Sequence, residues 1–322
     1  MLFRSSAWSD YNPELISKGG GVFERTAKSI PLTPEMKRLF ELEKDSVTPS
    51  ELISAILKAQ VDLIWFGGIG TYVKASSESH AEVGDRANDS VRVDGRDLRA
   101  RVIGEGANLG MTQRGRIEYA LAGGRLNTDA IDNSGGVTSS DYEVNIKILL
   151  GAARAQGRLS REQRDSLLRQ MTDEVAQLVL RTNYLQGQSI SVSCLLGPRL
   201  SDRYGRFMRF LERSGQLDRK MEFLPDEETL TQRAANGVGL TRPEMAVLMA
   251  YAKLDLYREL LESDLPDDPW LERDLLAYFP QPLREDFLSD IREHRLRREL
   301  VATQVSNEIV NRQGITFVQE IR

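Results

Sequence analysis

The sequence predicts an α/β fold with a parallel sheet in residues 1–150 and an all-helical domain in residues 151–322. Short apolar runs in the first part end at glycine clusters, and helices with capping signals lie between them. Strand signals disappear after about residue 143 and helical periodicity takes over. The length of 322 residues exceeds one ordinary domain, so the chain can form two substantial cores.

Two helix starts precede the first predicted strand. Thr33 and Thr48 are each followed by a proline, which places a threonine N-cap before a proline at the first helical position. Glu51 completes a capping box with Thr48. The apolar run 61–66 then reads as a buried strand, because it is short and ends at two glycines.

A second strand is predicted after a polar segment. Residues 75–97 are polar, and the run LRARVI at 98–103 leads directly into the turn GEGAN at 104–108. The first strand leads likewise into GGIGT at 67–71. Ligands of parallel sheets bind outside the carboxyl ends of the strands, so both turns lie where a ligand is expected.

The second half carries capped helices. Ser160 opens a capping box before one apolar-periodic segment, and Thr241 opens another in the sequence TRPE. A further helix is expected over about 283–310. The basic run REHRLRR at 292–298 is interleaved with glutamates, which predicts a solvated helix face.

Composition excludes several classes of function. The formal net charge of −5 argues against a general nucleic-acid binder. Cys194 is the only cysteine, so no disulfide can form within the chain. With only His80 and His294 besides, no metal site is expected. The sequence shows no signal peptide and no membrane-spanning run, so we expect a cytoplasmic protein.

The GGIGT turn has two interpretations. Gly67, Gly68, Gly70 and Thr71 could form a backbone nest for a phosphate or for cofactor oxygens. The full GxGxxG pattern is absent, because Val73 stands at the last glycine position. A tight turn after a strand would use the same residues.

Two further segments carry stronger signals. Glycines on both sides of Glu105 allow a ligand to approach the backbone, and Asn108 then presents its amide. Asn133 opens the segment NSGGVTSS, in which Ser140 is the last hydroxyl before a helix expected to begin near Asp141. A loop with a hydroxyl N-cap would read the same way, but the two segments together favour a binding site.

These segments resemble glutamate dehydrogenases, which carry an EGAN turn, an NAGGV turn, and then a serine and a glutamate on the following helix. This chain has EGAN at 105–108, NSGGV at 133–137, and then Ser140 and Glu143; Ser134 replaces the usual alanine. Stretches such as DLIWFGGIGTYVK, GEGANLGMTQRGRIEYA and LTRPEMAVLMAYAK resemble the C-terminal portion of the large-subunit, NAD-specific bacterial class. The resemblance spans nearly the whole chain.

The resemblance implies the second part of a Rossmann-like nucleotide-binding domain in residues 1–150 and a C-terminal helical domain in 151–322. It implies oxidative deamination of L-glutamate to 2-oxoglutarate and ammonia, with hydride transfer to NAD. Asn133 would orient the nicotinamide, Asn108 would contact the ribose side, and Ser140 would hold the distal carboxylate of glutamate. The remaining implied cofactor residues are Gly67, Gly68, Gly70 and Thr71.

The resemblance also implies what this chain lacks. The family's catalytic lysine and aspartate, and its phosphate-binding glycine fingerprint, lie upstream of the matching segments, so no catalytic residue is assigned here. We therefore expect an enzyme portion that is inactive by itself and belongs to a homo-oligomer in the complete enzyme. The alternative is a non-catalytic regulatory or scaffolding module that retains the fold.

Overall fold

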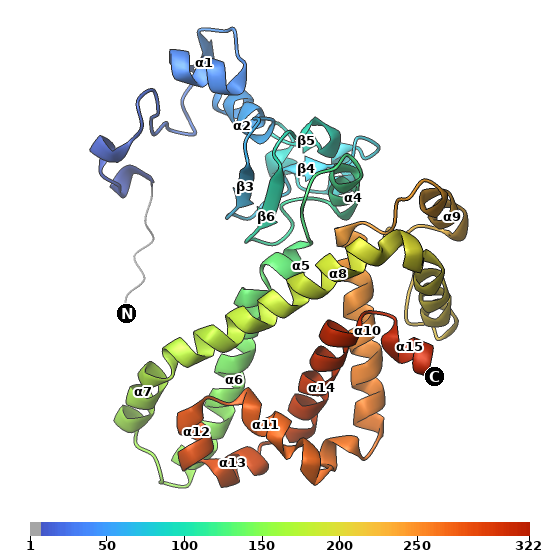
Figure 1. Cartoon of the computed structure of the whole chain (residues 1–322). Helices are drawn as coiled ribbons and strands as arrows, with labels where there is room; N and C mark the ends of the chain where they lie inside the picture. Colours follow the sequence, from blue (N-terminus) through green and yellow to red (C-terminus); the bar gives the residue numbers. More distant parts are fainter. Residues whose placement is uncertain (1–7) are drawn as a thin grey trace. The chain divides into compact units, whose positions relative to one another are not determined.

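The computed structural model describes residues 8–322, which divide into two compact units (Figure 1). The first unit ends at Leu126, and the second runs from Asn127 to Arg322. The predicted boundary near residue 150 falls inside helix α6 (Ser134–Ala155). The functional domain limits 1–150 and 151–322 therefore stay a prediction.

The first unit combines short helices with three pairs of short strands. The antiparallel pair is β1 (Ile30–Pro31) with β2 (Ser46–Val47), and the parallel pairs are β3 (Leu63–Phe66) with β6 (Val102–Glu105) and β4 (Val73–Lys74) with β5 (Val93–Asp94). Its helices are α1 (Pro34–Phe40), α2 (Pro49–Leu57), α3 (His80–Val83) and α4 (Gln113–Leu121).

The predicted helix starts are confirmed. Thr33 is the N-cap of α1, and its side chain accepts a hydrogen bond from the amide of Met36. Thr48 and Glu51 form the capping box of α2. Both helices therefore begin where local side chains satisfy their first amide groups.

The predicted parallel pairing is confirmed, with a shift of the second strand. Leu63 pairs with Val102 and Phe66 pairs with Glu105. The expected burial of the first strand is wrong, because Leu63 and Trp65 are exposed. The second strand was expected over 98–103, but the carbonyl of Ala100 accepts a hydrogen bond from the Tyr119 hydroxyl at 2.7 Å. This carbonyl is thus satisfied by a side chain and not by the backbone of a neighbouring strand. Regular strand pairing begins only at Val102.

In the β4–β5 pair, β4 directly precedes the polar segment 75–97 and β5 lies within that segment. Val73 pairs with Val93 and Lys74 pairs with Asp94. The sequence pattern does not predict these strands, because two residues are too few to show an alternation.

The second unit consists of helices, and no strand is found in residues 127–322. Its first helices are α5 (Asp129–Asp132), α6, α7 (Arg161–Gln170), α8 (Thr172–Arg213) and α9 (Glu227–Ala235). The others are α10 (Arg242–Glu262), α11 (Glu272–Tyr278), α12 (Gln281–Asp286), α13 (Leu288–Arg292), α14 (Arg297–Gln313) and α15 (Phe317–Ile321). The expected all-helical character of this half is confirmed.

Two hydrophobic cores stabilise this unit. Helices α8, α10 and α14 enclose one core, in which Met208, Leu248 and Val310 are fully buried. Helix α6 packs with α11–α13 around a second core that buries Leu150 and Phe279. The predicted capping boxes at Ser160 and Thr241 open α7 and α10.

The single helix expected over 283–310 is wrong. The segment forms α12, α13 and α14, with a turn at His294. The basic run 292–298 is largely exposed, as expected, but it crosses a turn between two helices and does not form one helix face. The imidazole of His294 is buried; its Nε2 lies 3.1 Å from the carbonyl oxygen of Asn145, and its Nδ1 accepts a hydrogen bond from the amide of Leu296. These contacts hold the chain out of helical conformation at this point.

Among residues 8–322, no helix combines the length and the apolar character that a bilayer crossing requires.

The burial of His294 predicts a pH dependence of stability. Burial lowers the pKa of His294 below its ordinary value of 6.5. The unfolded chain therefore binds this proton more readily, and the free energy of unfolding falls as pH decreases below about 6.5. Above that pH the contribution is constant. Denaturant unfolding of the wild type and His294→Gln between about pH 7 and pH 5 measures this contribution, because the variant should lose part of the decline.

His80→Gln is the matched control for His294→Gln. It removes the other histidine of the chain, which is exposed, and so measures how much the loss of a histidine outside the core changes the pH profile. Parallel pH profiles for the wild type and His294→Gln would contradict the assignment.

Candidate functional site

The two glycine-containing turns of the first unit leave the same edge of the β3–β6 pair. The amide of Ala107 donates to the carbonyl of Phe66 at 3.0 Å, and the amide of Tyr72 donates to the carbonyl of Gly110 at 2.9 Å. Because the strands are parallel, their carboxyl ends meet at this edge. The structure thus brings residues 67–71 together with Asn108, as the sequence predicted.

The turn at 67–71 presents exposed backbone at its start and is fixed at its end. Gly67 and Gly68 are exposed, and a Cβ on Gly68 would meet no atom within 4 Å. The amide of Thr71 donates to Asp85 at 2.8 Å, and its carbonyl accepts from Arg92 at 2.8 Å. A ligand can therefore approach the backbone at the glycines. At Thr71 both backbone groups are already hydrogen-bonded, so only the side chain can bind a ligand.

Gly70 has a conformational role in this turn. Its φ of +139° is one that other residues rarely adopt, and an added Cβ would lie 2.6 Å from Nδ2 of Asn88. Glycine is thus required here whether or not a ligand binds.

The glycines of GEGAN have a structural partner that the sequence did not indicate. The indole of Trp65 lies over Gly104 and Gly106, and a Cβ on Gly104 would be 2.6 Å from Cε3 of the ring. We expected these glycines to admit a ligand to the backbone, and in the structure they admit the indole. Trp65 itself is 59% exposed, so one face of the β3–β6 pair presents an aromatic surface beside the turns.

Glu105 lies beneath the turn and was not predicted to have this role. It is completely buried, and its carboxylate accepts from Nε of Arg116 at 2.7 Å and from Nη2 at 2.9 Å. The same carboxylate accepts from the amide of Met111 at 3.1 Å. It therefore ties the end of β6 to helix α4 and to the far end of the turn.

At the tip of this turn, one residue has a backbone conformation that is unfavourable for any residue except glycine. Leu109 has a φ of +60° and is 62% exposed. A residue other than glycine in this region costs about 1–3 kcal/mol, and such residues cluster at ligand sites. Asn108, which is exposed, precedes it directly.

The other two predicted residues lie in the second unit, on helix α6. The helix was expected to begin near Asp141 but begins at Ser134, with Asn133 at the N-cap. Asn133 and Ser140 are seven residues apart, so they share one face of the helix, about 10 Å apart along its axis. The Ser140 side chain is too far into the helix to be an N-cap; its hydroxyl donates to the carbonyl of Gly136 at 3.3 Å.

Helix α6 begins earlier than expected because of a contact with another helix. Asn183 of α8 donates through Nδ2 to the carbonyl of Ile131 at 2.9 Å and to the hydroxyl of Ser134 at 2.7 Å. This contact holds the start of α6 against α8 and explains why the two glycines do not delay the helix. It also gives Ser134 a role that an alanine could not fill.

One cavity of the first unit is lined by none of the residues of the two turns. It has a volume of about 510 Å³ and is lined by Asp62 and Val102 at the amino ends of β3 and β6. At the carboxyl ends, Gly67, Gly68 and Asn108 are exposed. Within residues 8–322, no group of three or more His, Cys, Asp or Glu side chains could hold a metal ion.

Comparison with known proteins shows similarity along most of the chain. Residues 1–193 match the family described as "Bacterial NAD-glutamate dehydrogenase, catalytic domain", and residues 237–322 match "Glutamate dehydrogenase, C-terminal". The chain is 54% identical over 317 residues to the NAD-specific glutamate dehydrogenase of Pseudomonas aeruginosa and 52% identical over 316 residues to that of Halomonas elongata. It is 47% identical over 322 residues to that of Mycobacterium tuberculosis. Each alignment covers 98% of this chain and 20% of the relative, so the chain spans about a fifth of their length.

The buried ion pair predicts a large loss of stability in Glu105→Ala. Removal of the carboxylate leaves the guanidinium of Arg116 buried without its partner, which costs about 3–5 kcal/mol. Asp62→Ala is the control, because it breaks the exposed ion pair with Arg101 and should cost about 0–1 kcal/mol. Chemical denaturation of both variants measures the difference, and similar losses would contradict the role of Glu105.

Proposed function

The chain belongs to the bacterial NAD-glutamate dehydrogenase family, and we propose that it is one segment of an enzyme that converts L-glutamate to 2-oxoglutarate and ammonia. NAD, when bound, accepts the hydride that leaves the substrate. The names of the relatives support both the reaction and the cofactor. The proposal concerns the complete enzyme, since this chain corresponds to a fifth of those relatives.

The observation that carries the proposal is the parallel pairing of β3 with β6, each followed by a glycine-containing turn at the same edge. Dinucleotide-binding sheets of the Rossmann type bind their ligand at such an edge. We therefore propose that residues 1–150 form part of a Rossmann-like nucleotide-binding domain and residues 151–322 a C-terminal helical domain.

The proposed cofactor residues of the first unit fit a nucleotide. Gly67 and Gly68 offer exposed backbone with open space around it, Gly70 shapes the turn, and Thr71 offers its hydroxyl. Asn108 stands exposed on the neighbouring turn, where its amide can bond to the ribose side.

On helix α6, we propose that Asn133 orients the nicotinamide and that Ser140 holds the distal carboxylate of glutamate. The support is their common helix face and the exposure of Ser140. The hydroxyl of Ser140 donates a long hydrogen bond of 3.3 Å within its own helix. It could donate to a substrate carboxylate instead, and that charge-assisted bond would be stronger.

We also propose that the complete enzyme is a cytoplasmic homo-oligomer. The second candidate function is a non-catalytic regulatory or scaffolding module that retains the fold. An activity assay of the isolated chain, and of the complete enzyme with altered Ser140, tests the two functions.

We expect no oxidation of glutamate by the isolated chain, even at millimolar NAD. General acid–base chemistry needs a positioned lysine and aspartate, and we propose that other segments of the complete enzyme supply them. The measurement is NADH formation by purified protein, followed by absorbance. NADH formation that is lost in Asn133→Ala would show that the chain contains a complete catalytic site.

In the complete enzyme, Ser140→Ala should raise the KM for glutamate about tenfold or more and leave the KM for NAD nearly unchanged. A hydrogen bond to a charged group contributes about 1.5–3 kcal/mol, and about 1.4 kcal/mol is a factor of ten. The melting temperature should stay the same or rise slightly, because alanine is the better helix former. Steady-state kinetics and thermal unfolding of the same variant provide both readouts.

Ser139→Ala is the matched control, because its hydroxyl also donates within α6, to Gly135 at 2.7 Å, from the neighbouring position. It should leave the KM for glutamate unchanged. Equal effects of the two substitutions, or unchanged glutamate kinetics in Ser140→Ala, would remove Ser140 from the substrate site.

A further inference from the structure

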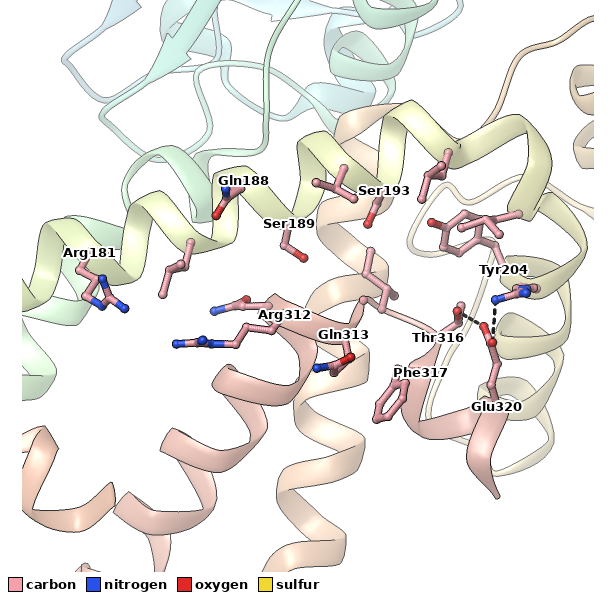
Figure 2. Close-up of a pocket in the computed structure, with 18 residues that line it drawn as sticks. Arg181, Gln188, Ser189, Ser193, Tyr204, Arg312, Gln313, Thr316, Phe317 and Glu320 are labelled. Carbon is pink, nitrogen blue, oxygen red and sulfur yellow. Dashed lines mark hydrogen bonds and ion pairs between the residues drawn. The ribbon is translucent and has the colours of Figure 1, made fainter. Parts of the chain in front are cut away.

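A cavity of about 710 Å³ lies within the second unit, between α8 and the segment that joins α14 to α15 (Figure 2). Its volume lies in the range of small-molecule binding sites, about 300–1,000 Å³. None of the residues proposed above for NAD or glutamate lines it. The cavity is therefore separate from the residues proposed for the reaction.

The walls follow from local geometry. Arg181, Leu185, Gln188 and Val192 recur at helical spacing, so one face of α8 forms a wall. Opposite, Gly314 ends α14 with a φ of +102°, a conformation that favours glycine. The chain then turns so that the following residues complete the cavity.

The charges in the cavity are unbalanced. Three arginines line it, against a single lining carboxylate, that of Glu320. Arg203 pairs with Glu320 at 2.8 Å, and Arg312 pairs with Glu308, which does not line the cavity. The guanidinium of Arg181 makes no hydrogen bond or ion pair within residues 8–322. The surplus of positive charge attracts an anion.

Two side-chain amides also line the cavity. Gln188 and Asn311 both line the cavity, and the carbonyl oxygen of the Asn311 side chain is buried without a hydrogen-bond partner within residues 8–322. A buried polar atom without a partner is unfavourable, so a ligand with a hydrogen-bond donor would stabilise this site. In Figure 2, Arg181 and Arg312 point toward the same end of the cavity.

We propose that this cavity binds a small organic anion, with its carboxylate or phosphate group between Arg181 and Arg312 and a hydroxyl or amino group near Asn311. Guanidinium groups bind both kinds of anion through paired N–H donors. The apolar side chains of Leu185, Val192 and Phe317 would contact the carbon skeleton. The site is separate from the proposed reaction, so such a ligand would act as a regulator.

The test is isothermal titration calorimetry of this chain with two probes, malate as a carboxylate and glycerol 3-phosphate as a phosphate. We expect at least one probe to bind at millimolar concentration or below, and the stronger one identifies the anionic group. Arg181→Gln and Arg312→Gln should each raise the Kd about tenfold or more, as the loss of a charge-assisted bond predicts.

Arg258→Gln is the matched control, because Arg258 is an exposed arginine of α10 outside the cavity. It should leave the Kd unchanged, and circular dichroism of all three variants should match the wild type. Absence of binding by both probes at millimolar concentration would overturn the proposal. Equal weakening by Arg258→Gln, or binding that survives both cavity substitutions, would overturn it as well.

Discussion

The edge of the β3–β6 pair depends on one buried ion pair, between Glu105 and Arg116. Burial of two charges costs several kcal/mol per ion, and only close hydrogen bonds offset that cost. Here the carboxylate accepts two bonds from the guanidinium and one from the amide of Met111. These contacts fix both ends of the turn 106–110, and Leu109 can therefore adopt its costly conformation at the tip.

The elements with local signals could be predicted from the sequence. Thr48 and Glu51 satisfy helix ends through neighbours three residues apart, and the apolar run 61–66 ends at glycines that are visible in the sequence. Parallel pairing followed from the helix and glycine pattern around two such runs. The resemblance to glutamate dehydrogenases is confirmed over nearly the whole chain.

The features that were missed depend on partners far away in the sequence or on packing. Trp65 covers Gly104, Asn183 holds the start of α6, and the carbonyl of Asn145 lies against the ring of His294. None of these contacts leaves a periodic pattern, so the sequence favoured a ligand at the glycines, a later helix start and one long helix. The cavity beside α8 also could not be predicted from the sequence, because the turn at Gly314 brings distant residues together to form it.

The most direct test of the central claim is amide hydrogen exchange of the complete enzyme with and without NAD. If the two turns bind the cofactor, NAD should slow exchange in residues 67–70 and 106–110, while β1 and β2 stay unchanged. Those two strands pair with each other and not with the β3–β6 pair, so they serve as the internal reference. Unchanged exchange in both turns, with protection only elsewhere, would contradict the claim.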